Sequence, residues 1–372
     1  MRYHMLLLPL LIAGLAACEP SERVDRSEET SRTNEPGVAI QANHTTQASH
    51  TDQTPAESSQ ATVQTESALT ITEWRVPWDG RPRDPYVAPD GRIFFVGQQT
   101  HYIGIFNPET EEFDRHNLED GAGPHTVIVA DDGTLWYAGN RARHIGKMDP
   151  ETGEITKFMM DDEYARDPHT FDFDRHGNIW FTAQGGNGVG YFDVDTGEAT
   201  VIPVPTERAR PYGIVMDTAG ERPWIVLFGT NKLATVDPET MELEEIELPR
   251  EEARPRRLAV TSDDRVWYGD YAAGYLGSYD PSSGEITEWE LPDGAESRPY
   301  AMTRDDRDRL WVVTSGTSPN RFVGFDPETE EFFARIDIDS GGGTVRHMVF
   351  NEEDHSIWFG TDTNYLGQAI VN

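Results

Sequence analysis

Residues 132–158 read DGTLWYAGNRARHIGKMDPETGEITKF, and variants of this stretch recur along most of the chain. Short apolar runs alternate in it with Asp-Gly and Asp-Pro pairs, which favour turns. One aromatic residue marks each copy, at intervals of 42 to 47 residues: Phe94, Trp136, Trp180, Trp224, Trp267, Trp311 and Trp358.

Each copy contains the material for four short strands. In the second copy the strand-like runs are residues 127–130, 135–138, 145–148 and 155–158. A unit of four strands repeated at this period is typical of a β-propeller, whereas a helical solenoid would show a 3.6-residue apolar period, and none is visible. The sequence therefore predicts an all-β, seven-bladed propeller over residues 69–372.

The last copy ends at Asn372 after only three strand-like runs. Residues 69–74, LTITEW, resemble residues 285–289, EITEW, the fourth run of the fifth copy. We therefore predict that an N-terminal strand completes the seventh blade. Such closure removes sheet edges that would otherwise invite aggregation.

The first 68 residues have a different composition. Residues 1–18 combine Arg2, an apolar run and Leu15-Ala16-Ala17-Cys18, which resembles a bacterial lipoprotein signal, so we expect Cys18 to be the lipidated residue. Residues 19–68 are rich in Ser, Thr, Gln and Glu and predict a disordered tether. By resemblance, Glu19 after the cysteine favours the outer membrane, with the lipid as the membrane contact.

Composition excludes several classes of function. The formal net charge is −35, and nucleic-acid binding needs a basic face, so no nucleic-acid partner is expected. Cys18 is the single cysteine, which excludes an intramolecular disulfide, a cysteine zinc site and a CxxCH haem site.

We expect a monomeric propeller.

Aligning the copies on their turns gives one polar residue per blade near the start of the first strand. Innermost strands line the channel of a propeller, so these side chains predict a preorganised ligand site at one mouth. The alternative is that they fill a wet channel and hydrogen-bond one another. The seven residues are Arg83, His125, His169, Tyr212, Arg256, Tyr300 and His347.

Further arginines stand two positions before several members of this ring: Arg81, Arg210, Arg254 and Arg298. Arginine forks suit carboxylate, sulfate or phosphate groups, so we expect an anionic small molecule as ligand. The alternative is local pairing with carboxylates such as Glu207, Glu251, Glu252 and Glu296.

The motif D-G-x-(I/L)-W-F … I-G-x-x-D-P-x-T-G-x-I-T-E resembles the repeats of the virginiamycin B lyase family, over residues 69–372. The resemblance implies a carbon–oxygen lyase that opens a lactone by elimination. It also implies Mg²⁺ held by two glutamates, with a histidine as acid or base. In the last two blades only His347 matches that site. Tyr300 stands at the other histidine, Val345 at the first glutamate and Asp362 near the second.

A similar pattern occurs earlier in the ring. Asp167-Pro168-His169 is followed by Gln184, and Pro124-His125 precedes it in the second blade. We therefore take His125, His169 and His347 as candidate catalytic residues. Asp167, Gln184 and Asp362 are candidate ligands of a divalent metal, either Mg²⁺ by resemblance or a softer cation held by histidines; no other cofactor is expected.

Three functions stay open at this point. One is a lyase, or less readily a hydrolase, acting on an anionic ester or lactone. The second is a non-catalytic propeller that binds a ligand, and the third is a scaffold in the cell envelope.

Overall fold

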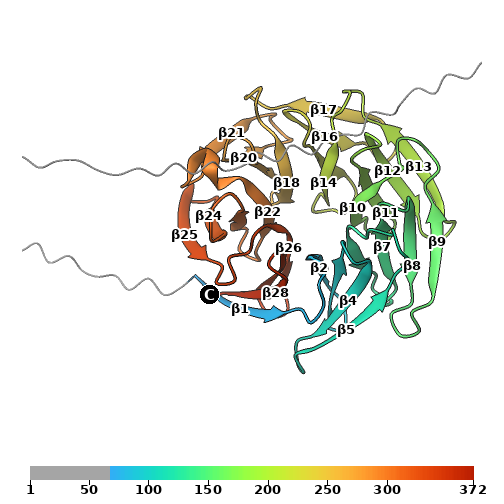
Figure 1. Ribbon diagram of the computed structural model, residues 1–372. Helices are drawn as coiled ribbons and strands as arrows, with labels where there is room; N and C mark the ends of the chain where they lie inside the picture. The colour runs from blue at the N-terminus through green and yellow to red at the C-terminus, as the bar shows by residue number, and fades with distance from the viewer. Residues whose placement is uncertain (1–67) are drawn as a thin grey trace, which may run out of the picture. The chain divides into compact units, whose positions relative to one another are not determined.

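The computed structural model describes residues 68–372, which form seven four-stranded antiparallel sheets around a common axis (Figure 1). The predicted seven-bladed propeller is confirmed. The signal segment, Cys18 and residues 19–67 of the predicted tether lie outside the described residues. Within residues 68–372, no helix is long and apolar enough to cross a membrane.

In blades 1 to 6 the strands run from the inner to the outer one in chain order. Blade 1 contains β2 (Pro82–Val87), β3 (Ile93–Gly97), β4 (Tyr102–Asn107) and β5 (Glu112–Asn117). Blade 2 contains β6 (Val127–Val129), β7 (Leu135–Gly139), β8 (His144–Met148) and β9 (Ile155–Met159). Blade 3 contains β10 (Pro168–Phe173), β11 (Ile179–Ala183), β12 (Gly188–Asp193) and β13 (Glu198–Pro203).

Blades 4 to 6 repeat this order. Blade 4 contains β14 (Pro211–Met216), β15 (Pro223–Leu227), β16 (Lys232–Val236) and β17 (Leu243–Glu247). Blade 5 contains β18 (Pro255–Val260), β19 (Val266–Asp270), β20 (Tyr275–Tyr279) and β21 (Ile286–Glu290). A short 3₁₀ turn, η1 (Gly294–Ser297), leads to blade 6, with β22 (Pro299–Arg304), β23 (Leu310–Thr314), β24 (Arg321–Asp326) and β25 (Glu331–Asp337).

Blade 7 joins the two ends of the propeller. Its strands lie in the order β1 (Leu69–Arg75), β28 (Tyr365–Val371), β27 (Ser356–Thr361) and β26 (Val345–Asn351). The outer pair runs in register from Leu69 opposite Val371 to Arg75 opposite Tyr365. Trp74 stacks on Trp358 with ring centroids 5.8 Å apart. The predicted closure by an N-terminal strand is thus confirmed.

The repeated residues of the motif are the core of the fold. All seven marker aromatics are buried, with at most 4% of their surface exposed. The glycine of the Ile-Gly pair recurs because of its contact with the neighbouring strand of the same blade. A Cβ on Gly146 would lie 2.1 Å from the ring of Tyr137, so only glycine lets that aromatic ring lie flat against the neighbouring strand.

Candidate functional site

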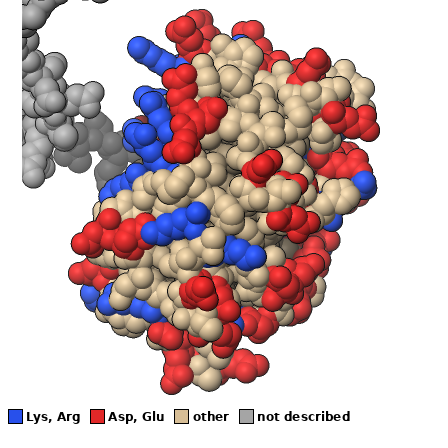
Figure 2. All heavy atoms as spheres, turned by 90° about the vertical axis from the view of Figure 1, so that its right-hand side faces the viewer, with Lys and Arg blue, Asp and Glu red and all other residues tan. Residues whose placement is uncertain are grey.

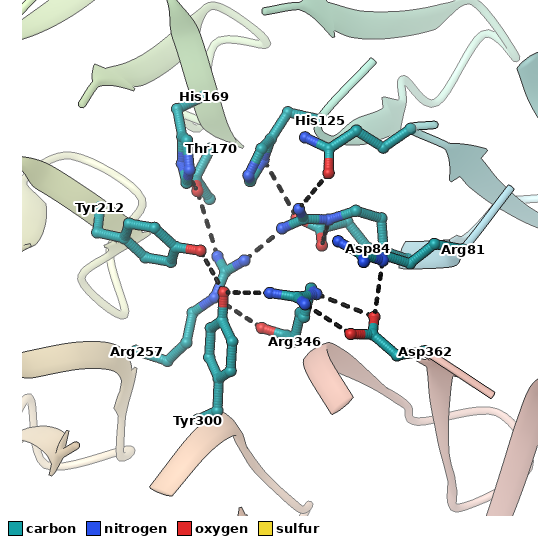
Figure 3. Close-up of polar contacts among 12 residues, drawn as sticks. Arg81, Asp84, His125, His169, Thr170, Tyr212, Arg257, Tyr300, Arg346 and Asp362 are labelled. Carbon is teal, nitrogen blue, oxygen red and sulfur yellow. Dashed lines mark hydrogen bonds and ion pairs between the residues drawn. The ribbon is translucent and has the colours of Figure 1, made fainter. Parts of the chain in front are cut away.

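A β-bulge in the first strand of most blades directs the ring side chains into the channel. In β22 the ladder is in register at Pro299 and again at Met302, but shifts between them, where Tyr300 lies. The same shift follows Pro168, Pro211 and Pro255. Bulges re-aim side chains, and Figure 3 shows the resulting convergence of side chains from different blades.

The strand register corrects the sequence alignment of blade 7. Val345 pairs with Thr361 as Pro299 pairs with Thr314, so Arg346, not His347, is the counterpart of Tyr300. The β26–β27 connection is one residue longer than its counterpart in blade 6, and counting back from the turn therefore shifts the alignment by one. Arg346 was not predicted from the sequence. In blades 1 to 6 a proline precedes the ring residue, and its absence before His347 was the one sign that the alignment differed in blade 7.

A buried ion cluster closes the centre of the channel. Asp84 accepts hydrogen bonds from Arg83 Nε at 3.0 Å and from Arg257 Nη2 at 3.2 Å. Arg257 reaches across from blade 5 and also donates to Thr170 Oγ1 and to the carbonyl of Arg346. Burial opposes ionisation of Asp84, but the two guanidinium groups outweigh it and hold its pKa below its usual value.

Asp84 and Arg257 were not predicted from the sequence. Each follows a ring residue directly, at a position occupied in blades 4 and 6 by Gly213 and Ala301. Only their charge, unusual for the interior of a sheet, marked them.

The histidine side of the ring lies on blades 2 and 3. His125 and His169 are 3% exposed, with ring centroids 3.4 Å apart, and His169 Nδ1 lies 2.9 Å from Thr170 Oγ1. Burial lowers both pKa values well below the usual one, and the positive charge of Arg83 lowers them further. Both imidazoles are therefore uncharged at neutral pH.

The tyrosine–arginine side lies on blades 4 to 6. The hydroxyls of Tyr212 and Tyr300 form a hydrogen bond, and the Arg256 guanidinium lies 3.6 Å from the Tyr300 ring centroid. Arg256 Nε is buried without a hydrogen-bond partner. Burial by itself raises the pKa of Tyr212, but Arg83, Arg256 and Arg257 outweigh it and lower that pKa to about 8.

The rim of the mouth carries a half-buried ion pair in blade 7. Arg346 donates to Asp362 through Nε at 3.1 Å and Nη2 at 2.6 Å, and Arg81 Nε lies 3.3 Å from Asp362 Oδ1. Side-chain exposure is 18% for Arg346, 19% for Asp362 and 34% for Arg81. These three side chains are therefore within reach of a ligand.

The other predicted rim arginines are less organised. Arg210 and Arg298 are exposed, and Arg254 Nη1 donates to the backbone carbonyls of Glu251 and Ala253. Within residues 68–372 no ion pair joins Arg210, Arg254 or Arg298 to the four glutamates named as local partners. Figure 2 shows acidic side chains spread over this face of the molecule, with fewer basic side chains among them, several of these at its upper left edge.

The candidate metal ligands are not brought together. Asp167 accepts the backbone N–H groups of Gly185 and Gly186, at 2.5 and 2.7 Å, whereas Asp362 lies in blade 7 and is taken up by two arginines. Among the described residues, no group of three His, Cys, Asp or Glu side chains could hold a metal ion. The residues present thus do not fit the Mg²⁺ site that the resemblance implies.

Gln184 occupies a position that is used for side-chain contacts in other blades. It follows the marker aromatic by four residues, as do Gln98 and Asp362. Gln98 accepts a hydrogen bond from Arg83 Nη1 at 3.0 Å, and Asp362 accepts from Arg346. This position therefore holds ring arginines in place in blades 1 and 7.

A second space lies further along the channel. A cavity of about 380 Å³ is lined by the inner strands, from Arg257 and His347 to Arg304 and Asp217. Burial and the charge of Arg257 lower the pKa of His347 to about 3. His347 thus borders this cavity, one position further along its strand than the ring.

Comparison with known proteins agrees with the family suggested by the motif. Residues 54–224 match the model of the virginiamycin B lyase family. The chain is similar to the structure of virginiamycin B lyase from Staphylococcus aureus, with 21% identity, a TM-score of 0.73, and coverage of 82% of this chain and 100% of that one.

Two further structures show the same architecture. A catalytically inactive variant of the Staphylococcus aureus enzyme with quinupristin has 20% identity and a TM-score of 0.74, over 82% of this chain and 100% of that one. Hydrazine synthase from Kuenenia stuttgartiensis has 13% identity and a TM-score of 0.64, over 79% and 96%. No protein with curated annotation matches the chain. The resemblance to virginiamycin B lyases is confirmed, and the solved structures show the fold.

Proposed function

We propose that this chain, a propeller resembling the virginiamycin B lyases, is a carbon–oxygen lyase that opens an anionic ester or lactone at the arginine-rich channel mouth. One observation carries the proposal. Guanidinium groups from different blades converge at the mouth, and among them Arg256 Nε is buried without a hydrogen-bond partner, a cost that a ligand can offset.

The reaction class suits these groups. In an elimination a base takes a proton from the carbon beside a carbonyl, and the released electron pair forms a carbon–carbon double bond. The carbon–oxygen bond at the next carbon then breaks, and its electrons leave with a carboxylate. A guanidinium group is well matched to the negative charge that develops on that carboxylate.

We assign the proton acceptor to the cluster of His169 and Tyr212. Their ring centroids are 4.3 Å apart, and the lowered pKa values leave an uncharged imidazole beside a readily ionised phenol. Tyr212, with a pKa of about 8, is partly ionised near neutral pH and can accept the proton, while the uncharged His169 ring packs against it. His125 supports His169 by ring contact, whereas the position of His347 on the second cavity gives it no part in this step.

The metal is not part of this proposal. Its candidate ligands Asp167, Gln184 and Asp362 lie in two blades, and their carboxylates already have partners. No step is therefore assigned to Mg²⁺.

A panel of cyclic depsipeptides and lactones tests the proposal. Elimination opens the ring without changing the mass and creates a double bond that absorbs in the ultraviolet, whereas hydrolysis adds one water. We expect ring-opened products of unchanged mass, lost in Tyr212→Phe. A mass gain of one water would show a hydrolase, and binding without turnover would show a ligand-binding propeller.

We also propose attachment to the outer membrane through a lipid on Cys18. The support is Leu15-Ala16-Ala17-Cys18 and the polar composition of residues 19–68. Cys18→Ser is expected to move the protein from the membrane fraction to the soluble fraction. Unchanged membrane association of that variant would contradict the anchor.

A further inference from the structure

We propose that Arg346 and Arg256, on either side of Tyr300, form a subsite that binds a carboxylate group without a divalent metal. The inference rests on the proposed function for the source of that group, the carboxylate released by elimination. Its geometry stands on its own.

The three side chains share one face of the mouth. Arg346 Nη1 lies 3.5 Å from the Tyr300 hydroxyl, and the Arg256 guanidinium lies over the Tyr300 ring. Aromatic contacts hold Arg256 from several sides, including Tyr271 at 4.4 Å and Phe228 at 4.5 Å. These contacts fix the guanidinium without using its Nε donor, which stays available to a ligand.

Asp362 acts as a positioning residue for Arg346. The carboxylate takes the Nε and Nη2 edge of the guanidinium and leaves Nη1 directed toward Tyr300 (Figure 3). A bidentate pair of this kind fixes the orientation of the fork as well as its charge. Asp362 thus aims Arg346 across the mouth.

The same pair argues against a metal at Asp362. Both carboxylate oxygens already face guanidinium groups, from Arg346 and Arg81. A divalent cation would have to displace one of them and then lie beside two like charges. With Arg256 included, the rim has three positive charges and one carboxylate, and this excess of two positive charges favours an anionic ligand.

The number of free donors favours a carboxylate over a phosphate. The Tyr300 hydroxyl is already bonded to Tyr212 and Arg346, so the groups left for a ligand are Arg256 Nε and the second N–H of Arg346 Nη1. These two donors match the two oxygens of a carboxylate, whereas the oxygens of a phosphate accept more hydrogen bonds than two donors can supply. The ligand class is therefore a monoanionic carboxylate.

Calorimetric titration of the full chain with benzoate, and with neutral benzamide, tests the subsite. In buffer with EDTA we expect benzoate to bind and benzamide to bind at least tenfold more weakly. Arg346→Ala and Arg256→Ala should each weaken benzoate binding about 10- to 100-fold, the range of a charged hydrogen bond. Replacing EDTA with MgCl₂ should change nothing.

Arg309→Ala is the matched control. Arg309 pairs with Asp305 at 2.8 Å with 15% side-chain exposure, close to the 18% of Arg346, but lies at the β22–β23 turn. The Arg309→Ala variant should be less stable than the wild type and should bind benzoate with unchanged affinity. If Arg346→Ala does not fold, Arg346→Lys serves, because one ammonium cannot hold Asp362 and bind a carboxylate in the fork geometry.

Three results would overturn the inference: benzoate binding that requires Mg²⁺, equal binding of benzamide, or wild-type affinity in folded Arg346 and Arg256 variants. The lyase proposal fails separately. Benzoate binding without turnover of any lactone would reject the elimination and leave the carboxylate subsite standing.

Discussion

The histidine side and the arginine side of the ring differ in burial and in how many of their polar groups have partners within the protein. On the histidine side, His125 and His169 are 3% exposed, in ring contact with each other and uncharged at neutral pH. On the arginine side, Arg256 and Arg346 are only partly buried, and Arg256 keeps an unpaired donor. The residue types most suggestive of catalysis thus lie where a ligand has least access.

The difference teaches that residue type and availability are separate properties. The same ring position gives a packed imidazole in one blade and a ligand-ready guanidinium in another, because neighbouring blades supply different partners. Five experiments separate the roles of the two sides and of the blade that joins the chain ends.

The largest effect should come from removing the closing strand. Deleting residues 19–75 removes β1 and exposes the apolar edge of β28. Blade 7, which carries Arg346, then lacks its outer strand. We expect aggregation or a melting temperature lower by more than 10 °C, measured by thermal unfolding. Deleting residues 19–66 instead should leave the melting temperature unchanged, and equal melting of both truncations would refute the closure.

Asp84→Asn should cost about 3–5 kcal/mol, because it leaves Arg83 and Arg257 buried without a counter-charge. Urea unfolding measures the loss. The pKa of Asp84 is lowered in the folded state, so its contribution is complete above the usual carboxyl pKa and is lost as the pH falls below about 4. Asp362→Asn at the half-exposed rim should cost about 1 kcal/mol or less, and a similar cost for both would contradict the central cluster.

Two arginines of the ring should respond in opposite ways. Arg83→Ala should lower stability, because Arg83 is 4% exposed and bonded to Asp84. Arg256→Ala should instead weaken ligand binding by about 1.5–3 kcal/mol with little loss of stability. Unfolding and calorimetry on both variants separate the two roles; loss of stability alone in Arg256→Ala would make that arginine structural.

The histidine side should show a pH dependence of stability. Burial lowers the folded-state pKa values of His125 and His169, so below about pH 6.5 the unfolded chain takes up protons that the folded chain refuses. Stability should then fall with decreasing pH, by up to about 1.4 kcal/mol per unit and per histidine. Imidazole NMR signals should titrate well below pH 6.5, and a titration near 6.5 would show that these rings are open to water.

The smallest effect concerns Tyr212. Its lowered pKa predicts tyrosinate absorbance that rises near pH 8, well before ordinary tyrosines ionise. Because the folded state favours the phenolate, this group adds stability that is complete above pH 10 and is lost as the pH falls through about 8. Absorbance at alkaline pH measures the step, Tyr212→Phe should remove it, and an unchanged step in that variant would assign it to another tyrosine.

Sequence alone was sufficient for the architecture. The recurring aromatic, the Ile-Gly pair and the Asp-Pro turn each act within one blade or against its neighbour, so their spacing predicts strands, blades and closure. The ring was also largely predicted, because residues at equivalent places in equivalent blades lie at equal height. The structure has Arg83, His125, His169, Tyr212, Arg256 and Tyr300 at or just before the inner strands, and their roles toward a ligand stay predictions.

Only the tertiary structure decided which of these residues meet and which stay partly exposed at the mouth. A single extra residue in the β26–β27 turn exchanges Arg346 for His347 at the ring, and strand register alone shows it. Arg257 reaches Asp84 across the channel from four blades further along the chain. Long side chains that cross the channel bring together residues far apart in sequence, and burial then sets their charge. The spacing of one repeat encodes neither these contacts nor these charges.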